Sequence, residues 1–342
     1  DALEANKQEL FKTTMAFDSS QNISASNVRI SGTISSSALD IADPSWSPDG
    51  SKIAYLVTNS NYSTVNKVIG VNYHDVSIGG RHSVRLSSPA TFPSYRDITG
   101  YAWSADGNRL AYLSNPANNF LENAYQIDFT AGSLMPTVGS LENGYSVIDV
   151  AYSADSQSLA TRRFNAGSSQ YRMRIENAAS GSEIYTADTA DRISRMKWGN
   201  QTSVLAYQME SAATGNYSLK VADLDRAVYD IDLHNGDTSS ENALSFEWSH
   251  DDDRLALTTQ GTSSPFVMRL RAYNLSSGNS VLLTTLPSGR LIGGARWSLD
   301  DQRIAFSSAE AGCRNAQVHS TPAASSNVIN LDDIDCPRGF VY

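Results

Sequence analysis

The chain has 342 residues, of which 26 are basic and 36 acidic, so its net charge is −10. Hydrophobic residues make up 40% of the chain, which is enough to build a core and argues against wholesale disorder. The acidic balance argues against general nucleic-acid binding, because phosphates are met by clustered lysine and arginine. No stretch approaches the roughly 18 apolar residues that a membrane-spanning helix needs.

Residues 1–35 are expected to form an extension ahead of the rest of the chain. Residues 1–17 fit a weak amphipathic helix, in which four apolar residues fall near one face: Leu3, Leu10, Phe11 and Met15. Such a helix could pack on the remainder of the protein, or it could dock a partner or a neighbouring copy. Residues 27–34 alternate as a strand, which could join the last sheet of the protein and close a ring.

Six segments between residues 36 and 342 share one pattern: an aromatic residue, a short turn and an alternating apolar stretch. The first of them reads Trp46-Ser-Pro-Asp-Gly50-Ser-Lys-Ile53-Ala-Tyr55. The aromatic residue ends one strand, Pro and Gly favour a tight turn, and Ile-Ala-Tyr begins a second strand. Asp replaces this Gly in two later segments and also tolerates a positive φ. The six aromatic anchors are Trp46, Trp103, Tyr152, Trp198, Trp248 and Trp297.

These segments recur about every 50 residues, and two further short strands follow each of them. Four short strands per repeat, in six repeats, are typical of the blades of a β-propeller. A sandwich or a parallel β-helix fits the period less well. We therefore predict one all-β domain over residues 36–342, a six-bladed β-propeller. A short helical or extended N-terminal extension over residues 1–35 precedes it.

The pattern Trp-Ser-Pro-Asp-Gly-x-x-Ile-Ala-Tyr resembles the repeat of TolB-like β-propellers, which are relatives of the WD-repeat class. The resemblance covers about residues 38–335, is clearest in the first two repeats and is most degraded in the fourth. It implies a propeller and says little about activity, since such repeats occur in periplasmic scaffold proteins, peptidases and carbohydrate-active enzymes. The residues ahead of the first repeat are too few for the α/β domain of TolB. No Gly-x-Ser-x-Gly motif indicates a hydrolase domain.

The two cysteines, Cys313 and Cys336, lie near the C-terminus. In an exported protein we expect them to form one disulfide, which would contribute about 3 kcal/mol by loop-entropy reasoning. The alternative is a pair of buried free thiols. The cysteine pair, the scarcity of lysine and the start at Asp1 together predict export to the periplasm or the exterior of a bacterial envelope.

A propeller binds ligands at the mouth of its central channel, where the innermost strand of each blade begins. The charged residues predicted there form a mixed ring of acids and arginines, which suits a polar peptide or a sugar. Alternatively, these charges pair with one another around a water-filled channel. The predicted binding residues are Asp43, Arg96, Asp97, Asp149, Arg192, Arg195, Glu241 and Arg290.

The sequence predicts no catalytic residue, no metal site and no cofactor. His74 and His82 flank a Gly-Gly turn and could approach each other, but scattered histidines account for them better than a metal pair. The acidic stretches at residues 251–253 and 330–335 lack the spacing of an EF-hand and fit solvated loops.

We therefore expect a non-catalytic, exported module that binds a protein or peptide partner or serves as a scaffold, without nucleic acid and without a membrane span. One alternative is a structural subunit of a surface or extracellular assembly, linked through its N-terminal segment, so that the partner is a copy of itself. Another is a polysaccharide-active enzyme, a lyase or a hydrolase, with its site at the channel mouth. A perturbed carboxylate at the mouth would favour the enzyme, and paired charges would count against it.

Overall fold

The strands of a computed structural model follow the repeats of the sequence. The structure describes residues 10–17, 23–30, 39–59, 67–77, 84–86, 98–115, 121–131, 137–138, 144–310, 314–325 and 327–333. The chain divides into two compact units, the first reaching Thr186 and the second beginning at Ala187, except that residues 153–155 and 170–172 belong to the second. Within the described ranges, no helix is long and apolar enough to cross a membrane.

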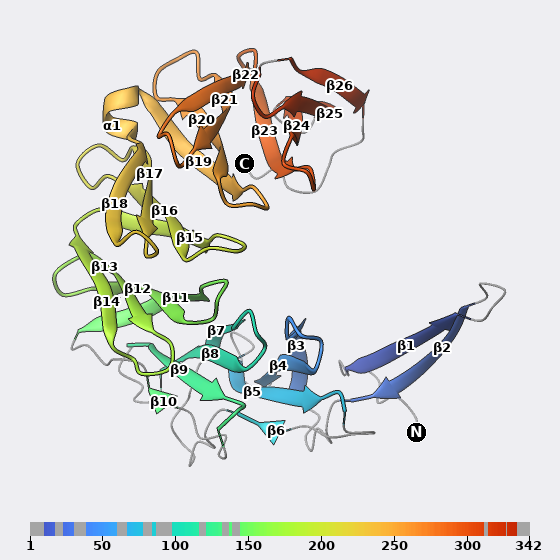
Figure 1. The fold of residues 1–342 in the computed structure, drawn as a ribbon. Helices are drawn as coiled ribbons and strands as arrows, with labels where there is room; N and C mark the ends of the chain where they lie inside the picture. The colour runs from blue at the N-terminus through green and yellow to red at the C-terminus, as the bar shows by residue number, and fades with distance from the viewer. Residues whose placement is uncertain are drawn as a thin grey trace. The chain divides into compact units, whose positions relative to one another are not determined.

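Each repeat forms its own four-stranded antiparallel sheet, with the strands in chain order (Figure 1). The first two sheets contain β3 (Leu39–Trp46), β4 (Lys52–Asn59), β5 (Lys67–Asp75), β6 (Val84–Arg85), β7 (Ile98–Trp103), β8 (Arg109–Ser114), β9 (Asn123–Asp128) and β10 (Thr137–Val138). The third sheet contains β11 (Tyr145–Tyr152), β12 (Ser158–Asn165), β13 (Gln170–Asn177) and β14 (Glu183–Thr189).

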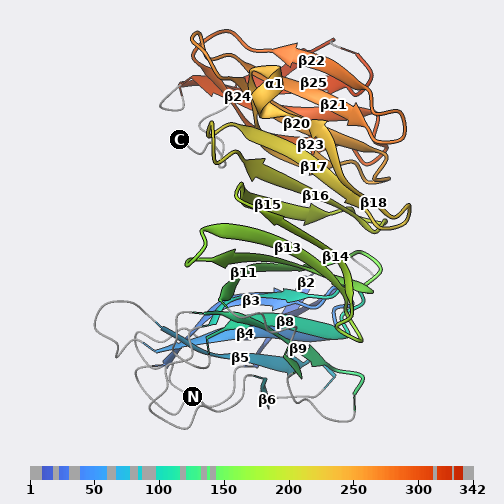
Figure 2. The same ribbon diagram turned by 90° about the vertical axis from the view of Figure 1, so that its left-hand side faces the viewer.

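Three sheets make up most of the second unit, and they stack face against face (Figure 2). Their strands are β15 (Arg192–Trp198), β16 (Val204–Glu210), β17 (Tyr217–Asp223), β18 (Val228–His234), β19 (Glu241–Trp248), β20 (Arg254–Gly261), β21 (Met268–Asn274), β22 (Ser280–Thr285), β23 (Arg290–Trp297), β24 (Arg303–Glu310), β25 (Arg314–Pro322) and β26 (Ile329–Asp333). The short helix α1 (Gly236–Ser239) lies beside β17 and β19.

The predicted turns are confirmed in their geometry. The first strand of every four-stranded sheet ends at the aromatic anchor of its repeat. In five of the six sheets the turn that follows has a residue with positive φ, which is glycine at Gly50 (φ 69°) and aspartate at Asp252 (φ 60°) and Asp301 (φ 54°); the turn after β15 has none among its described residues. Aspartate therefore replaces glycine in the later repeats without changing the turn.

The first strand of every four-stranded sheet also contains a β-bulge, two to four residues before its aromatic anchor. The shift in register falls between Ala42 and Ser45, Ile98 and Gly100, Val147 and Asp149, Ile193 and Arg195, Ala243 and Ser245, and Ile292 and Ala295. A bulge leaves one or two residues outside the ladder and re-aims the side chains beside it. The bulge therefore sets which residues share a face with those just before the anchor.

The core of the second unit lies between neighbouring sheets. Trp248 and Leu255 are buried with Val221 of the preceding sheet, and Trp297 and Phe306 are buried with Leu270 of the sheet before theirs. Apolar side chains on the facing sides of two sheets exclude water, which is the main favourable term in their packing. In this unit, Trp248 and Trp297 thus pack one sheet against another, whereas the first anchor, Trp46, is exposed.

The N-terminal segment differs from the helix that the sequence predicts for residues 1–17. Residues 1–9 lie outside the described part, but β1 (Phe11–Phe17) is a strand rather than the end of an amphipathic helix. It pairs with β2 (Ile23–Arg29), so residues 27–29 join this two-stranded sheet rather than the last four-stranded one. Alternating polar and apolar residues with two threonines suit a strand, and the pairing with β2 supplies the hydrogen bonds that a short helix would have made.

Candidate functional site

Three of the predicted binding residues begin the first strand of a sheet, and each is paired within its own sheet. Arg192 lies 3.4 Å from Glu210, Arg290 donates to Ser308 Oγ at 2.9 Å, and Glu241 Oε1 lies 3.1 Å from Arg271 Nη2. Burial acts to raise the pKa of Glu241, but hydrogen bonds and the charge of Arg271 outweigh burial and lower it. These side chains therefore tie strands of their own sheets together, through partners that lie outside the predicted set.

Asp43 and Asp149 lie further along the first strands of their sheets, at the bulges of β3 and β11. Asp43 is exposed, and its backbone oxygen accepts a hydrogen bond from the Tyr101 hydroxyl. Burial raises the pKa of Asp149, and the Arg162 guanidinium at 3.4 Å does not reverse that shift. Arg96 and Asp97 lie outside the described residues, as do both cysteines, so the disulfide remains a prediction.

Charged side chains gather on one face of the first strands of the second unit. Because side chains alternate along a strand, the residues three positions and one position before each anchor share a face. The three tryptophan anchors themselves are buried. The residues on the charged face are Arg195 and Lys197 of β15, Ser245 and Glu247 of β19, and Gly294 and Arg296 of β23.

These strands line a cavity of about 540 Å³. Arg195, Ser245, Glu247, Gly294 and Arg296 line it, together with the hydroxyl-bearing Thr258 and Ser307 and the apolar Phe246, Phe306 and Val318. Cavities that hold small ligands fall in the range of roughly 300–1,000 Å³, with a few polar groups fixing orientation. This cavity has that size and that mixture of groups.

The charge of the cavity is predominantly positive. Glu247 Oε1 lies 2.7 Å from Lys197 Nζ, and Glu247 Oε2 lies 3.4 Å from Arg296 Nη1. Arg195 donates to the Leu244 backbone oxygen at 3.5 Å and has no carboxylate partner among the described residues. Two arginines and one carboxylate therefore line the cavity, and Lys197, which is not part of the lining, pairs with the same carboxylate, in a protein whose net charge is −10. The cavity suits an anionic group.

Glycines at the bulge of β23 keep one wall of the cavity open. Gly293 and Gly294 fall outside the register that pairs β23 with β24. A Cβ atom added to Gly294 would meet no atom within 4 Å, because it would point into open space. The backbone is therefore accessible to a ligand at this point.

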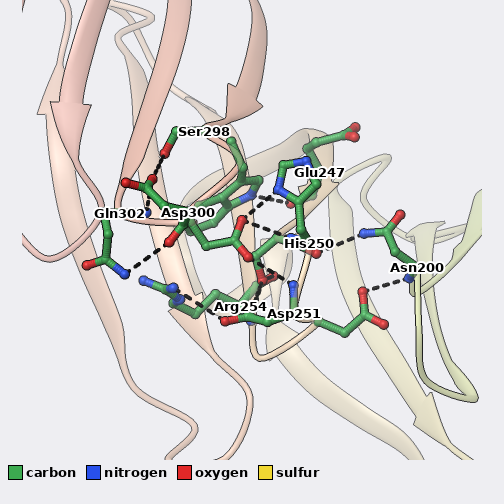
Figure 3. Close-up of polar contacts among 12 residues, drawn as sticks. Asn200, Glu247, His250, Asp251, Arg254, Ser298, Asp300 and Gln302 are labelled. Atoms are coloured by element: carbon green, nitrogen blue, oxygen red, sulfur yellow. Dashed lines mark hydrogen bonds and ion pairs between the residues drawn. The ribbon is translucent and has the colours of Figure 1, made fainter.

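The turns at the ends of these strands hold the walls in place. Figure 3 shows His250 and Asp251, in the turn after β19, next to Ser298 and Asp300, in the turn after β23. Asp301 accepts hydrogen bonds from the backbone amides of His250 and Asp251, each at 2.9 Å. Because one carboxylate links two turns, the strands that carry the cavity residues have a fixed spacing.

The anchors add a second link between the same strands. Trp297 Nε1 donates to the Glu247 backbone oxygen at 3.1 Å, and Trp248 Nε1 donates to the Lys197 backbone oxygen at 3.0 Å. Each indole thus bonds the residue that precedes the anchor of the neighbouring sheet. The backbone of the charged residues is held from behind, while their side chains face the cavity.

No family model matches this sequence, and no curated protein matches it. Solved structures do. An oligogalacturonate lyase from Vibrio parahaemolyticus aligns with a TM-score of 0.56 and 10% identity over 95% of this chain and 85% of its own. The chain has a β-propeller fold. An oligogalacturonate lyase in complex with manganese aligns with a TM-score of 0.55 and 10% identity, over 96% of this chain and 86% of its own. A prolyl endopeptidase aligns with a TM-score of 0.58 and 12% identity, over 92% of this chain and 45% of its own.

The propeller thus spans most of the lyases but less than half of the prolyl endopeptidase. At identities of 10–12% these likenesses show the fold alone. One lyase holds manganese. In this propeller, the described residues bring no three His, Cys, Asp or Glu side chains together for a metal ion, and His82 lies outside them. The described side chains therefore do not fit a metal site of that kind.

Of the charged residues that line this cavity, the sequence predicts Arg195 alone as a binding residue. Glu247 and Arg296 of the lining, and Lys197 beside it, lie further along their strands than the charged residues expected at the channel mouth. The signal was available in the repeat itself. The position just before the anchor is Ser or Ala in the first three repeats and Lys, Glu and Arg in the last three.

Proposed function

We propose that this propeller is a polysaccharide-active enzyme that acts on a carboxylate-bearing sugar chain, and that its six sheets are the six blades of one TolB-like ring. The observation that carries the proposal is the cationic cavity between β15, β19 and β23. Guanidinium groups pair well with carboxylates, and Arg195 and Arg296 offer two of them. Hydroxyl groups of Ser245 and Thr258 suit the hydroxyls of a sugar.

The solved structures support the enzyme over the non-catalytic scaffold that the sequence led us to expect. Oligogalacturonate is a chain of sugar acids, and the lyases named for it match this propeller over most of both chains. The prolyl endopeptidase carries more than half of its length outside the match, so its activity transfers less readily. Export to the periplasm or the cell exterior is part of this proposal, because such sugar chains lie there.

Cleavage of an acidic polysaccharide tests the proposal. The protein should release new chain ends from polygalacturonate and none from a neutral glucan. Ultraviolet absorbance of an unsaturated product would identify a lyase, and new reducing ends without that absorbance would identify a hydrolase. Replacing Arg195 with Ala should reduce the rate about tenfold or more, because the ligand carboxylate loses one cation.

Arg226→Ala is the matched control, because Arg226 is an exposed arginine of the same unit outside the cavity and should leave the rate unchanged. Binding of polygalacturonate without cleavage would overturn the enzyme and return the protein to the non-catalytic binding class. If the protein neither binds nor cleaves any acidic polysaccharide, the cavity is not the site.

A second candidate function, a structural subunit of an assembly, is favoured by the N-terminal sheet. β1 and β2 form a two-stranded sheet that pairs with no other strand among the described residues. Met15 is 62% exposed, and Phe11 on the same face of β1 is also exposed. An isolated two-stranded sheet is marginally stable in water, and exposed apolar residues on it favour cover by another chain. A neighbouring copy would supply that cover.

Light scattering across a range of protein concentrations tests this second function. The unmodified protein should associate, and Met15→Asp should weaken association about tenfold or more by placing a charge in the apolar contact. Thr14→Asp places the same charge on the other face of β1 and should leave association intact. A protein that stays monomeric at every concentration would contradict the assembly.

A further inference from the structure

Glu247 occupies an unusual place, because among the described residues it is the one carboxylate that lines the cavity. Its two oxygens are divided between two cations of the neighbouring strands, Lys197 at 2.7 Å and Arg296 at 3.4 Å. It thus stands where the carboxylate of a ligand would stand. We propose that Glu247 is an internal counter-ion, which a ligand carboxylate displaces from Arg296. This inference rests on the proposed function and adds how the site selects for charge.

The ion pair between Glu247 and Arg296 is weak enough for a ligand carboxylate to replace Glu247. The Arg296 side chain is 76% exposed, whereas those of Lys197 and Glu247 are 42% and 25% exposed. A pair at 3.4 Å with one largely solvated partner contributes little, because water screens it and the long side chain keeps its freedom. The closer and less exposed contact to Lys197 keeps Glu247 in place after Arg296 has turned to the ligand.

Arg195 supplies the first contact for an incoming anion. It lines the cavity together with Arg296, and among the described residues the contact of its guanidinium is a long hydrogen bond to the Leu244 oxygen. A carboxylate can bind Arg195 without breaking any ion pair among the described residues. Its second oxygen or a second carboxylate then competes with Glu247 for Arg296, and a neutral sugar cannot compete in this way.

The consequence is a site whose affinity for anions is held down by its own acid. Without ligand, the charge of Glu247 offsets the repulsion between Lys197 and Arg296, which it contacts with one oxygen each. With ligand, Glu247 and the ligand carboxylate have the same charge and compete for the same cation. Removing the charge of Glu247 should therefore strengthen the binding of acids and leave neutral ligands unaffected.

Calorimetric titration with trigalacturonate at neutral pH tests this inference in the full chain. Glu247→Gln should bind the trimer roughly fivefold more tightly than the unmodified protein. The fully methyl-esterified trimer, which is neutral, should show no such gain. Glu210→Gln removes the acid paired with Arg192 at 3.4 Å, outside the cavity lining, and should change neither affinity.

Lys197→Met provides a second variant of opposite sign. It removes one cation and frees Glu247 to pair fully with Arg296, so the trimer should bind several-fold more weakly. If Glu247→Gln does not fold, this variant decides alone. Equal or weaker binding by a folded Glu247→Gln overturns the inference while leaving the proposed function intact, provided that the unmodified protein binds and cleaves. Failure of every variant and of the unmodified protein to bind overturns both.

Discussion

Replacing Asp301 with Asn should lower the free energy of unfolding by about 2–3 kcal/mol at neutral pH. The Asp301 carboxylate is buried and accepts two backbone N–H groups, from His250 and Asp251, and its Oδ1 lies 2.8 Å from His250 Nδ1. An amide keeps one oxygen and aims an N–H₂ group at a donor, so a buried amide of the neighbouring turn loses its partner. Asparagine tolerates the positive φ of 54°, so backbone strain is not the cause.

The effect should depend on pH with a definite sign. Burial acts to raise the pKa of Asp301, but the hydrogen bonds from His250 and Asp251 outweigh burial and lower the pKa below its ordinary value. A group with a lowered pKa contributes stability above its unfolded pKa of about 4, and that stability is lost as the pH falls through the folded value. The difference in free energy of unfolding between the protein and its Asp301→Asn variant should have its full size above about pH 5. It should shrink as the pH falls below about 4.

Urea unfolding at a series of pH values measures this gap. Asp253→Asn is the control, because Asp253 is exposed in the preceding repeat's turn and its carboxylate makes no hydrogen bond or ion pair among the described residues. It should change the free energy of unfolding by no more than about 0.5 kcal/mol. A gap that persists undiminished at the lowest pH would show that the carboxylate charge is not what links the two turns.

The repeat made the first strands predictable and the N-terminal strands unpredictable, for physical reasons. The anchors Trp248 and Trp297 precede turns whose residues have strong conformational preferences, so strand ends could be located from local sequence alone. Residues 11–17 have no such turn ahead of them, and their apolar residues fit a helix and a strand almost equally well. What decides the matter is pairing with residues 23–29, a tertiary event that periodicity does not show.

The candidate site shows the same limit. Glu241 and Arg290 are correctly placed at strand starts, yet their partners lie on the second and third strands of their own sheets. Such pairs depend on cross-strand register, which sequence spacing does not fix. The bulge before each anchor also shifts which residues face the cavity. In an alignment of the repeats, these residues fall three positions before the anchor, as Arg195 does, and one position before it, as Arg296 does. Aligning the repeats with one another would have found them.

Replacing Gly294 with Leu should abolish ligand binding without harming the fold. The added Cβ meets no atom within 4 Å, so the side chain enters the cavity rather than the protein. We expect the affinity for trigalacturonate to fall on the order of 100-fold, because a bulky group takes the place of the sugar ring. The free energy of unfolding should change by less than about 1 kcal/mol, since no packed atom has to move.

The chain carries its own control for this substitution. Gly100 also stands three residues before its anchor, directly after the bulge of β7, and a Cβ there also meets nothing within 4 Å. Gly100→Leu therefore introduces the same side chain at the corresponding position of another repeat, in the first unit, outside the lining of the cationic cavity. It should bind the trimer as the unmodified protein does. Equal binding by Gly294→Leu would place the ligand elsewhere, and equal loss in both variants would mean that the first unit contributes to the site as well.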